Sequence, residues 1–476
     1  MTKITLSKKT LADQPKKYTR LILTEDAPTW HRLVECTDGT LEYRMGTGKQ
    51  KNITPRKFRT LVRSIVQAAQ SHQIEHLALH LGPIRNPQLE KEGNEWFYRT
   101  LAENLTLAAY TFTKYKSTKP KTKQLQEITV CGPIHKKEAD AFTVGLIVGA
   151  AANITRDIAN TSADDMTPAL LGKAATQAVA GTNASVKVLG EKELQKLKMG
   201  LLLAVGKGTR HETKLIVMEY WGAGKPTKNE TSKAKQPIVF VGKGVTYDTG
   251  GLNVKPSGFM HDMHMDMTGG AAVIGAIAAA AKMKLKKNVI GIIPAAENAI
   301  SDSAMRAGDI VTAMNGKTVE VLHTDAEGRM VLADALTYSE RYNPKAILDV
   351  ATLTGAALAA LGQQASAIMT KDQKLETHLR ELGEKSGDLV WPLPLWDEYQ
   401  APIKSVRADL CNIASNFSRF GGTIEGGAFL QNFAPKKVPW AHIDMAPRMD
   451  AIASDKLTKG ATGEPVRLLV RFAEEY

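Results

Sequence analysis

The chain has 476 residues, of which 43% are hydrophobic and 23% are charged, with 38 glycines and 20 prolines. This composition is typical of soluble globular proteins and excludes the collagen-like, disordered and coiled-coil classes. The length favours two or three domains. The longest uninterrupted apolar runs, such as residues 276–281, are too short to span a membrane. No apolar segment follows the basic residues of the N-terminus, so we expect no secretory signal and no membrane partner.

Charge is distributed unevenly along the chain. The net charge is +13, from 62 Lys and Arg against 49 Asp and Glu. Residues 1–135 hold 22 basic and 12 acidic residues, which leaves 40 and 37 for the rest of the chain. A basic N-terminal part can indicate affinity for nucleic acid or for an anionic surface, but a solvated surface that keeps the protein soluble is the favoured interpretation.

The cysteines indicate a reducing compartment. Cys36, Cys131 and Cys411 are far apart in the sequence and form no CxxC pair. An odd and sparse set of this kind argues against a disulfide framework and against a cysteine-rich zinc site. We therefore expect a cytoplasmic protein.

The first part of the chain is predicted to be α/β from its hydrophobic periodicity. The predicted strands are 20–23, 76–80 and 128–130, and the predicted helices are 57–69 and 96–112. The segment 114–123 carries five lysines and a proline, which is typical of a solvated loop. A long helix at 139–158 is expected to link this part to the next.

Strands and helices alternate through the rest of the chain, beginning with a helix that Thr167 and Pro168 start. The predicted strands are 186–189, 215–220, 238–241, 289–294, 318–322, 347–350 and 442–445. The predicted helices are 192–199, 271–283, 330–341 and 375–384. Residues 224–237, rich in Lys, Thr and Ser, are expected to form a surface loop.

This alternation predicts an α/β fold with a central mixed, mostly parallel sheet covered by helices. We expect a smaller basic N-terminal α/β domain over residues 1–135, a helical linker over 136–165 and a larger catalytic domain over 166–476.

Several common catalytic motifs are absent. The sequence has no HExxH zinc motif and no GxSxG nucleophile elbow, and its glycines match neither GxGxxG nor a P-loop. His261 and His264 lack a neighbouring Cys or His, which favours surface or packing roles over metal binding.

Two segments gather carboxylates directly after predicted strands. Residues 241–270 (VGKGVTYDTGGLNVKPSGFMHDMHMDMTGG) contain Asp248 and Asp266, and residues 323–329 (HTDAEGR) contain Asp325 and Glu327. In α/β sheets ligands bind at the carboxyl ends of strands. Four carboxylates match the charge of two divalent cations in a co-catalytic site, whereas exposed ion pairs with Lys and Arg are the alternative. In an extended backbone, the side chains of Asp325, Glu327 and Arg329 would point to one side.

The same segments resemble the leucyl aminopeptidase family, the cytosol aminopeptidases with a dinuclear metal site. The resemblance runs from about residue 160 to the C-terminus, whereas the first 135 residues show no convincing family motif. The matching motifs are GKGVTYDTGG, VKPS, Asp-Met before GGAA, PAAEN, RAGDIV, TDAEGR, DVATLTGA, PWAHIDMA and KGATG.

The resemblance implies a role for each matching residue. Asp248 and Glu327 would bridge two metal ions, Asp325 would complete one metal site, and Lys243, as a neutral amine, would complete the other together with Asp266. The ions would be Zn²⁺ or Mn²⁺, with Mg²⁺ or Co²⁺ as alternatives.

The catalytic and pocket roles also follow from the resemblance. Lys255 would stabilise the oxyanion, and Arg329 would hold a bicarbonate that acts as general base. Backbone groups near Ala326, Gly328 and Leu353 would assist Arg329. The residues expected to form an apolar side-chain pocket are Met263, Thr352, Gly355, Ala446 and Met449.

The implied function is release of an N-terminal amino acid, preferably apolar, from peptides by water activated between two metal ions. Family members are typically homohexamers, and some also bind DNA, which the basic N-terminal part leaves open here. Three departures stand out: His323 replaces the more usual Asn, Thr268-Gly269 varies a tripeptide after Asp266, and Pro447-Arg448 interrupts the apolar pocket region.

Overall fold

A computed structural model describes residues 2–82, 84, 86–118, 124–227, 235–418 and 420–476. The chain forms two compact units. The first comprises Met1–Asn153 and Ala451–Lys459, and the second comprises Ile154–Asp450 and Gly460–Tyr476. The sequence-based domain limits after residues 135 and 165 stay predictions.

The first unit is built on a six-stranded sheet in the order β1-β6-β5-β2-β4-β3, parallel except for the edge strand β3. Its strands are β1 (Lys3–Ser7), β2 (Thr19–Thr24), β3 (His31–Glu35), β4 (Leu41–Gly46), β5 (His76–Leu79) and β6 (Glu127–Cys131). Its helices are α1 (Pro55–Ser71), α2 (Pro87–Glu90), α3 (Asn94–Ala108) and the first part of α4 (Lys136–Ala159).

Local sequence explains where two of these helices begin and end. Thr54 caps α1 by accepting the N–H of Lys57 at 3.2 Å, and Pro55 occupies the first helical position. Helix α3 was predicted to reach residue 112 but ends at Ala108. The segment that follows, Tyr-Thr-Phe-Thr, consists of aromatic and β-branched residues, which are weaker helix formers than Ala or Leu.

Helix α4 is the one described helix that is long and apolar enough to cross a membrane. Of its most apolar stretch, 56% is buried within the structure. It packs closely on α3, because a Cβ added at Gly145 would lie 2.3 Å from the carbonyl oxygen of Arg99. Burial of this kind is typical of a core helix.

The second unit contains a nine-stranded sheet in the order β16-β15-β18-β14-β9-β11-β8-β7, with β10 paired to β11. Strands β18, β14, β9, β11 and β10 run parallel, whereas β8 and β15 are antiparallel to their inner neighbours. The strands are β7 (Ser185–Leu189), β8 (Lys214–Trp221), β9 (Ile238–Gly242), β10 (Gly244–Asp248), β11 (Asn288–Asn298), β14 (Ala346–Ala351), β15 (Ser366–Met369), β16 (Val390–Pro392) and β18 (Trp440–Asp444). This mixed, mostly parallel sheet confirms the predicted fold class.

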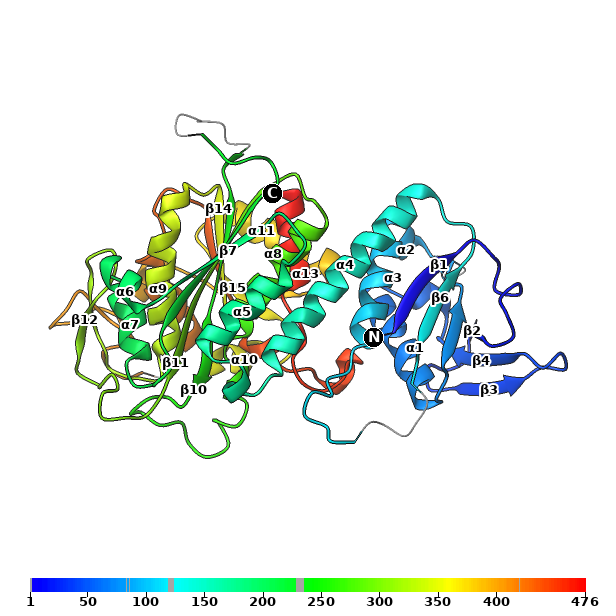
Figure 1. Ribbon diagram of the computed structural model, residues 1–476, viewed down its shortest axis with the longest axis horizontal. Helices are drawn as coiled ribbons and strands as arrows, with labels where there is room; N and C mark the ends of the chain where they lie inside the picture. Colours follow the sequence, from blue (N-terminus) through cyan, green and yellow to red (C-terminus); the bar gives the residue numbers. More distant parts are fainter. Residues whose placement is uncertain (1, 83, 85, 119–123, 228–234, 419) are drawn as a thin grey trace. The chain divides into compact units, whose positions relative to one another are not determined.

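Helices cover both faces of this sheet. Figure 1 shows α7 and α9 on one side and α5, α8 and α13 on the other. The helices of the second unit are α5 (Pro168–Ala178), α6 (Glu191–Lys196), α7 (Gly200–Gly206), α8 (Thr268–Lys282), α9 (Glu327–Ser339), α10 (Gly355–Leu361), α11 (Gln373–Ser386), α12 (Gly422–Gln431) and α13 (Val466–Glu475). Strands β9 and β14 are buried along their whole length, which explains their continuous apolar runs.

Two sequence-based assignments in this unit need correction. The strand predicted at 318–322 is only Thr318–Glu320 (β13), and it belongs to a separate three-stranded sheet with β12 (Ile310–Thr312) and β17 (Leu410–Cys411). Strand β10 was not predicted, because its glycine-rich sequence was interpreted as a loop. Its pairing with β11 places Asp248 opposite Asn298.

The two predicted surface loops lie partly outside the described residues, at 119–123 within 114–123 and at 228–234 within 224–237. All three cysteines are free, and Cys131 and Cys411 are buried.

Candidate metal centre and substrate pocket

The candidate site lies where the parallel strands of the nine-stranded sheet end. Lys243 follows β9, Asp248 ends β10, and Thr352 follows β14. The register pairs Gly242 of β9 with Val350 of β14, so these chain ends are neighbours at one edge. This is the edge at which α/β sheets bind ligands.

Three carboxylates meet at this edge. Asp248, Asp325 and Glu327 each offer an oxygen, and these oxygens lie within 4.8 Å of one another. Asp248 and Glu327 are buried and Asp325 is partly exposed. Acidic oxygens this close are a suitable ligand set for divalent cations.

The alternation of Asp325, Glu327 and Arg329 suggested an extended backbone at 323–329, but the backbone there is not extended. Asp325 lies in a turn, and Glu327 begins helix α9. The turn and the first residue of α9 nevertheless bring the carboxylates of Asp325 and Glu327 close together. Gly328 allows a close approach, since a Cβ there would lie 2.7 Å from Nζ of Lys243.

The two lysines contact different carboxylates. Nζ of Lys243 lies 2.8 Å from Oδ2 of Asp266 and 2.9 Å from Oε1 of Glu327. Nζ of Lys255 lies 2.8 Å from Oδ2 of Asp248 and 2.5 Å from Oδ1 of Asp325. The structure thus brings together all five predicted metal ligands and Lys255.

Burial and crowding shift the pKa values of these groups. Burial raises the pKa of Asp266 to about 8, although Lys243 opposes the shift. Burial raises the pKa of Asp325 to about 7, with Glu327 and Asp248 adding to it. Burial would lower the pKa of Lys243, but Asp266, Glu327 and Asp248 outweigh it and hold that pKa above its usual range. Four carboxylates in so dry a site require positive charge beside them, and this donor set fits divalent metal ions.

Neighbouring polar groups fix the carboxylates. Oδ1 of Asp248 accepts hydrogen bonds from Nδ2 of Asn298 and from the N–H of Gly250, both at 2.8 Å. Oγ1 of Thr352 donates to Oδ1 of Asp266 at 2.7 Å. Such hydrogen bonds orient ligand side chains. Sequence reasoning missed Asn298, although the PAAEN motif that ends on it was among the family resemblances.

A pocket of about 810 Å³ opens onto this cluster. Its lining includes every predicted site residue except Gly328. It also includes eight residues that sequence reasoning did not single out, namely Phe259, Thr354, Leu358, Ile413, Phe417, Ser418, Gly422 and Glu425. Four of these are large and apolar, Phe259, Leu358, Ile413 and Phe417, and they come from separate loops and a helix, so no single motif marked them.

Arg448 does not interrupt this pocket, contrary to the sequence-based expectation. It is 3% exposed, and its Nη2 pairs with Oε1 of Glu464 at 2.8 Å. Neither Pro447 nor Arg448 lines the pocket, whereas Ala446 and Met449 on either side of them do. The side chain of His261 is 81% exposed beside Asp262, and His261 is not part of the acidic cluster.

The contacts of Arg329 bear on the expected bicarbonate site, which stays a prediction. Its Nη1 donates to the carbonyl oxygen of Asn412 at 2.8 Å. Two of the expected amides already have acceptors: Ala326 N–H donates to the His323 carbonyl at 3.2 Å, and Leu353 N–H donates to a carboxylate at 3.1 Å. Glu425 lines the same pocket as Arg329. Nε of Arg329 is buried and has no hydrogen-bond partner among the described residues, so the guanidinium keeps a donor that could bind an anion.

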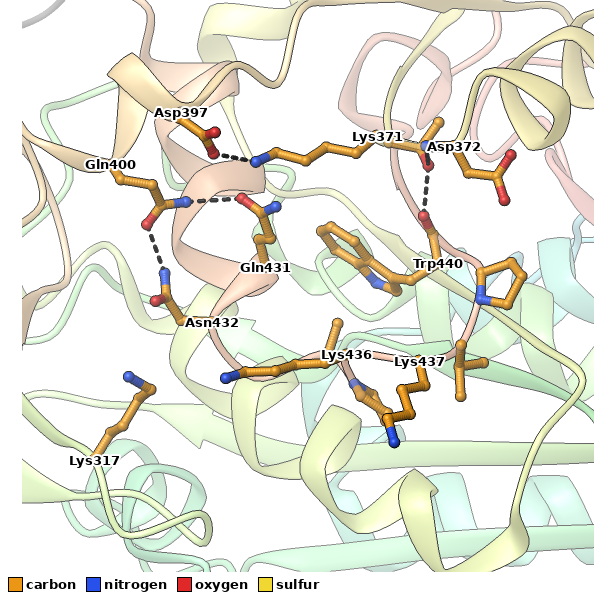
Figure 2. Close-up of a pocket in the computed structure, with 15 residues that line it drawn as sticks. Lys317, Lys371, Asp372, Asp397, Gln400, Gln431, Asn432, Lys436, Lys437 and Trp440 are labelled. Atoms are coloured by element: carbon orange, nitrogen blue, oxygen red, sulfur yellow. Dashed lines mark hydrogen bonds and ion pairs between the residues drawn. The ribbon is translucent and has the colours of Figure 1, made fainter.

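A larger cleft of about 870 Å³ shares no lining residue with this site. Figure 2 shows that its polar side chains pair with one another, Lys371 with Asp397 and Gln400 with Gln431 and Asn432. It contains none of the predicted catalytic groups.

Known proteins resemble this chain over both units. The catalytic-domain model of the cytosol aminopeptidase family matches residues 153–470, and the family's N-terminal-domain model matches residues 44–119. The N-terminal match lies in the part of the chain where no convincing motif was found.

Individual relatives agree with this assignment. A probable cytosol aminopeptidase of Nitrosospira multiformis is 40% identical over 437 residues, covering 90% of this chain and 80% of that protein. One from Azotobacter vinelandii is 41% identical over 436 residues, covering 90% and 84%. A solved structure, the bottromycin maturation enzyme BotP in complex with Mn, has a TM-score of 0.84 at 30% identity and covers 100% of this chain and 99% of that one. The chain therefore belongs to the cytosol aminopeptidase family, whose members are metal-dependent peptidases, and the resemblance seen in its motifs is confirmed.

Proposed function

We propose that this protein is a dinuclear metal aminopeptidase that releases N-terminal, preferably apolar, residues from peptides. The observation that carries the proposal is the cluster of four carboxylates, three of them buried, with Lys243 at the strand ends, which opens into a pocket with an apolar wall. One structure of the relative BotP is a complex with Mn. This supports Mn²⁺ as the metal here, and Zn²⁺, Mg²⁺ or Co²⁺ are alternatives that suit the same donor atoms.

Asp248, Asp266, Asp325, Glu327 and the amine of Lys243 would hold the ions. Two bound divalent cations would polarise the scissile carbonyl and lower the pKa of water. For Lys243 to act as a ligand it must lose its proton. Bound cations would favour that loss, because a nearby positive charge lowers the pKa of an ammonium group.

Lys255 is suited to stabilise the oxyanion that develops on the substrate. It lines the pocket, and Asp248, Glu327 and Asp325 hold the pKa of its ammonium above the usual range against the effect of burial, so the charged form is the one that these residues favour before ions bind. A charged donor fixed beside the reacting carbonyl stabilises the transition state more than the ground state.

The pocket wall supports the preference for apolar residues. Met263, Leu358 and Met449 line it together with the small residues Gly355 and Ala446. An apolar side chain gains on the order of 25 cal/mol per Å² of surface that it buries there.

End specificity provides the test. The acidic cluster would accept a substrate with a free α-amine, and acetylation removes that group. With Mn²⁺, Zn²⁺ or Co²⁺ added, we expect cleavage of Leu-amide and none of acetyl-Leu-amide, measured as ammonia release. Comparable rates on the two substrates would contradict an aminopeptidase.

The basic N-terminal part keeps DNA binding as a second candidate activity, favoured by its 22 basic against 12 acidic residues over 1–135. DNA affinity that falls steeply between low and physiological salt and is unchanged by a chelator would support it. The family name and the three free cysteines support a cytoplasmic location. A homohexamer is the expected assembly, which sedimentation can measure.

A further inference from the structure

Two phenylalanines in the lining of the substrate pocket have no role in the steps above. Phe259 is 69% exposed and Phe417 is 61% exposed, and both line the pocket that opens onto the acidic cluster. A large aromatic ring gains free energy when an apolar group covers it. Exposed rings inside a ligand pocket are therefore candidates for contact with the substrate.

Exposure increases from the bottom of this pocket to its mouth. The side chains of Glu327 and Lys243 are buried, and that of Lys255 is 13% exposed. Phe259 and Phe417 are the most exposed of the large apolar side chains in the lining. The acidic cluster therefore lies at the bottom of the pocket, and the two rings lie at its mouth.

A tight turn fixes the position of Phe259. Its N–H donates to the carbonyl oxygen of Pro256 at 3.1 Å, and Gly258 between them has a φ of 90°. A glycine with positive φ at the third position is typical of a type II turn. The turn directly follows Lys255, whose Nζ pairs with Asp248 at 2.8 Å. The ring of Phe259 is thus four residues from a group that the acidic cluster holds.

Phe417 lies in a second loop that is also anchored at the site. The carbonyl oxygen of Asn412 accepts Nη1 of Arg329 at 2.8 Å, and Nδ2 of Asn412 donates to the carbonyl oxygen of His323 at 2.7 Å. The N–H of Phe417 donates to the carbonyl oxygen of Ala414 at 2.9 Å. Its φ of 55° is uncommon for a bulky residue. Such conformations concentrate at functional sites.

The mouth of the pocket is the way out for the part of the peptide that follows the scissile bond. In the proposed function, the α-amine and the scissile carbonyl lie at the acidic cluster, and the first side chain lies against Met263 and Met449. Because the cluster is at the bottom, the rest of the peptide has to pass the two rings. A pocket of about 810 Å³ has the size of sites for drug-sized ligands, so it holds more than one side chain.

We propose that Phe259 and Phe417 form an aromatic subsite at the pocket mouth, which binds an apolar side chain in the leaving part of the peptide. The protein then selects its substrates twice, by the residue that it releases and by an apolar residue shortly after the scissile bond. This inference rests on the proposed aminopeptidase function.

A second copy of the chain is the competing occupant for exposed rings. Phe420, three residues after Phe417, is 88% exposed and does not line the pocket. Its exposure suits a contact with another molecule. Phe259 and Phe417 differ from it because they share a lining with the acidic cluster, which favours the substrate as their partner.

The test compares three tripeptide amides with the same first residue, namely Leu-Gly-Gly, Leu-Phe-Gly and Leu-Gly-Phe. The kcat/KM for leucine release is measured with Mn²⁺ bound. We expect wild-type protein to prefer at least one of the phenylalanine peptides to Leu-Gly-Gly. Because the metal ions and the released residue are the same for all three, this ratio cancels effects on metal binding and on chemistry.

Removal of either ring should reduce that preference. In Phe259→Ala and in Phe417→Ala the ratio should fall about 2–10-fold, the size of one aromatic contact. Phe259→Tyr and Phe417→Tyr keep the ring and should keep the preference. Phe420→Ala is the matched control, because it removes a more exposed ring from the same loop but outside the pocket, and its ratio should equal that of wild type.

The proposal is overturned if wild-type protein shows no preference for either phenylalanine peptide, if either alanine variant keeps the preference in full, or if Phe420→Ala loses it to the same extent. A changed sedimentation coefficient of Phe259→Ala or Phe417→Ala would assign the rings to a subunit contact and would also overturn it. Failure of wild-type protein to release leucine from any of the peptides or from Leu-amide would instead contradict the proposed function.

Discussion

Lys243 and Lys255 belong to the same glycine-rich segment but contact different carboxylates. Lys243 pairs with Asp266 and Glu327 and is 3% exposed. Lys255 pairs with Asp248 and Asp325. The sequence pattern alone does not distinguish the roles of the two lysines, and the family resemblance assigned them. In the structure the two lysines have different partners.

Exchanging each lysine for arginine tests these roles. Lys243→Arg should lower the bound metal, because a guanidinium stays protonated and offers no lone pair. Lys255→Arg should keep both ions and lose about 10²–10³-fold in kcat, because the charge is kept but displaced from the oxyanion. Metal content by elemental analysis decides between them. Loss of metal in Lys255→Arg with full occupancy in Lys243→Arg would reverse the two assignments.

At the residue scale, motifs predicted the acidic groups but not the residues that support them. Asp248 and Glu327 stand within contiguous signatures, whereas Asn298 reaches Asp248 only through the pairing of β10 with β11. Glu425 and Phe259 line the pocket although none of the family motifs quoted above includes them. Contacts formed by tertiary packing leave no local signal in the sequence.

At the scale of elements, helix α8 lies unusually close to the central strand β14. A Cβ added at Gly269, in the first turn of α8, would lie 2.2 Å from the carbonyl oxygen of Val350. The glycine therefore permits the approach that places Asp266 near Lys243. The departure noted at Thr268-Gly269 keeps the residue that this packing requires.

Gly269→Ala should destabilise the protein by about 1–3 kcal/mol or more, because backbone atoms cannot move aside as a side chain can. Gly355→Ala provides a matched control, since nothing lies within 4 Å of a Cβ at Gly355 in helix α10. Alanine there should be neutral or slightly stabilising. Denaturant unfolding measures both, and equal stability of the two variants would contradict the close packing.

Periodicity predicted long elements better than short ones. The buried strands β9 and β14 and helix α1 are continuous in their pattern, and their existence was predicted correctly. Strand β10 contains a glycine and borders a turn, so its pattern resembled a loop. The helix predicted at 192–199 ends at Lys196, and the chain reverses at Lys198, which has a φ of 59°, before α7.

On the scale of the whole molecule, the acidic cluster predicts that stability depends on metal. The carboxylates and lysines of the cluster come from β10, α9 and three connecting segments, so bound ions would link parts of the second unit that are far apart in sequence. The mostly parallel sheet and the location of the site at the carboxyl ends of its strands followed from the α/β pattern. The separate three-stranded sheet did not, because its strands are only two or three residues long.

Chelation should abolish activity and lower the thermal midpoint. A ligand that binds only the folded state stabilises it by about 2.7 kcal/mol at a hundred times its dissociation constant. Mn²⁺ or Co²⁺ should restore both activity and midpoint in a concentration-dependent way. Scanning calorimetry with and without metal measures the shift, and full activity of a metal-free preparation would contradict the mechanism.

The first compact unit is not one continuous stretch of chain, because residues Ala451–Lys459 return to it. This return segment accepts a hydrogen bond from Nη1 of Arg63 at the carbonyl oxygen of Asp455, at 3.0 Å, and Thr458 donates to the carbonyl oxygen of Tyr110 at 2.8 Å. A gene fragment that stops at residue 153 would lack these partners, including one for Arg63, which is only 6% exposed. Exchange of N-terminal domains between relatives, in the laboratory or in evolution, would therefore have to carry two separate coding segments together.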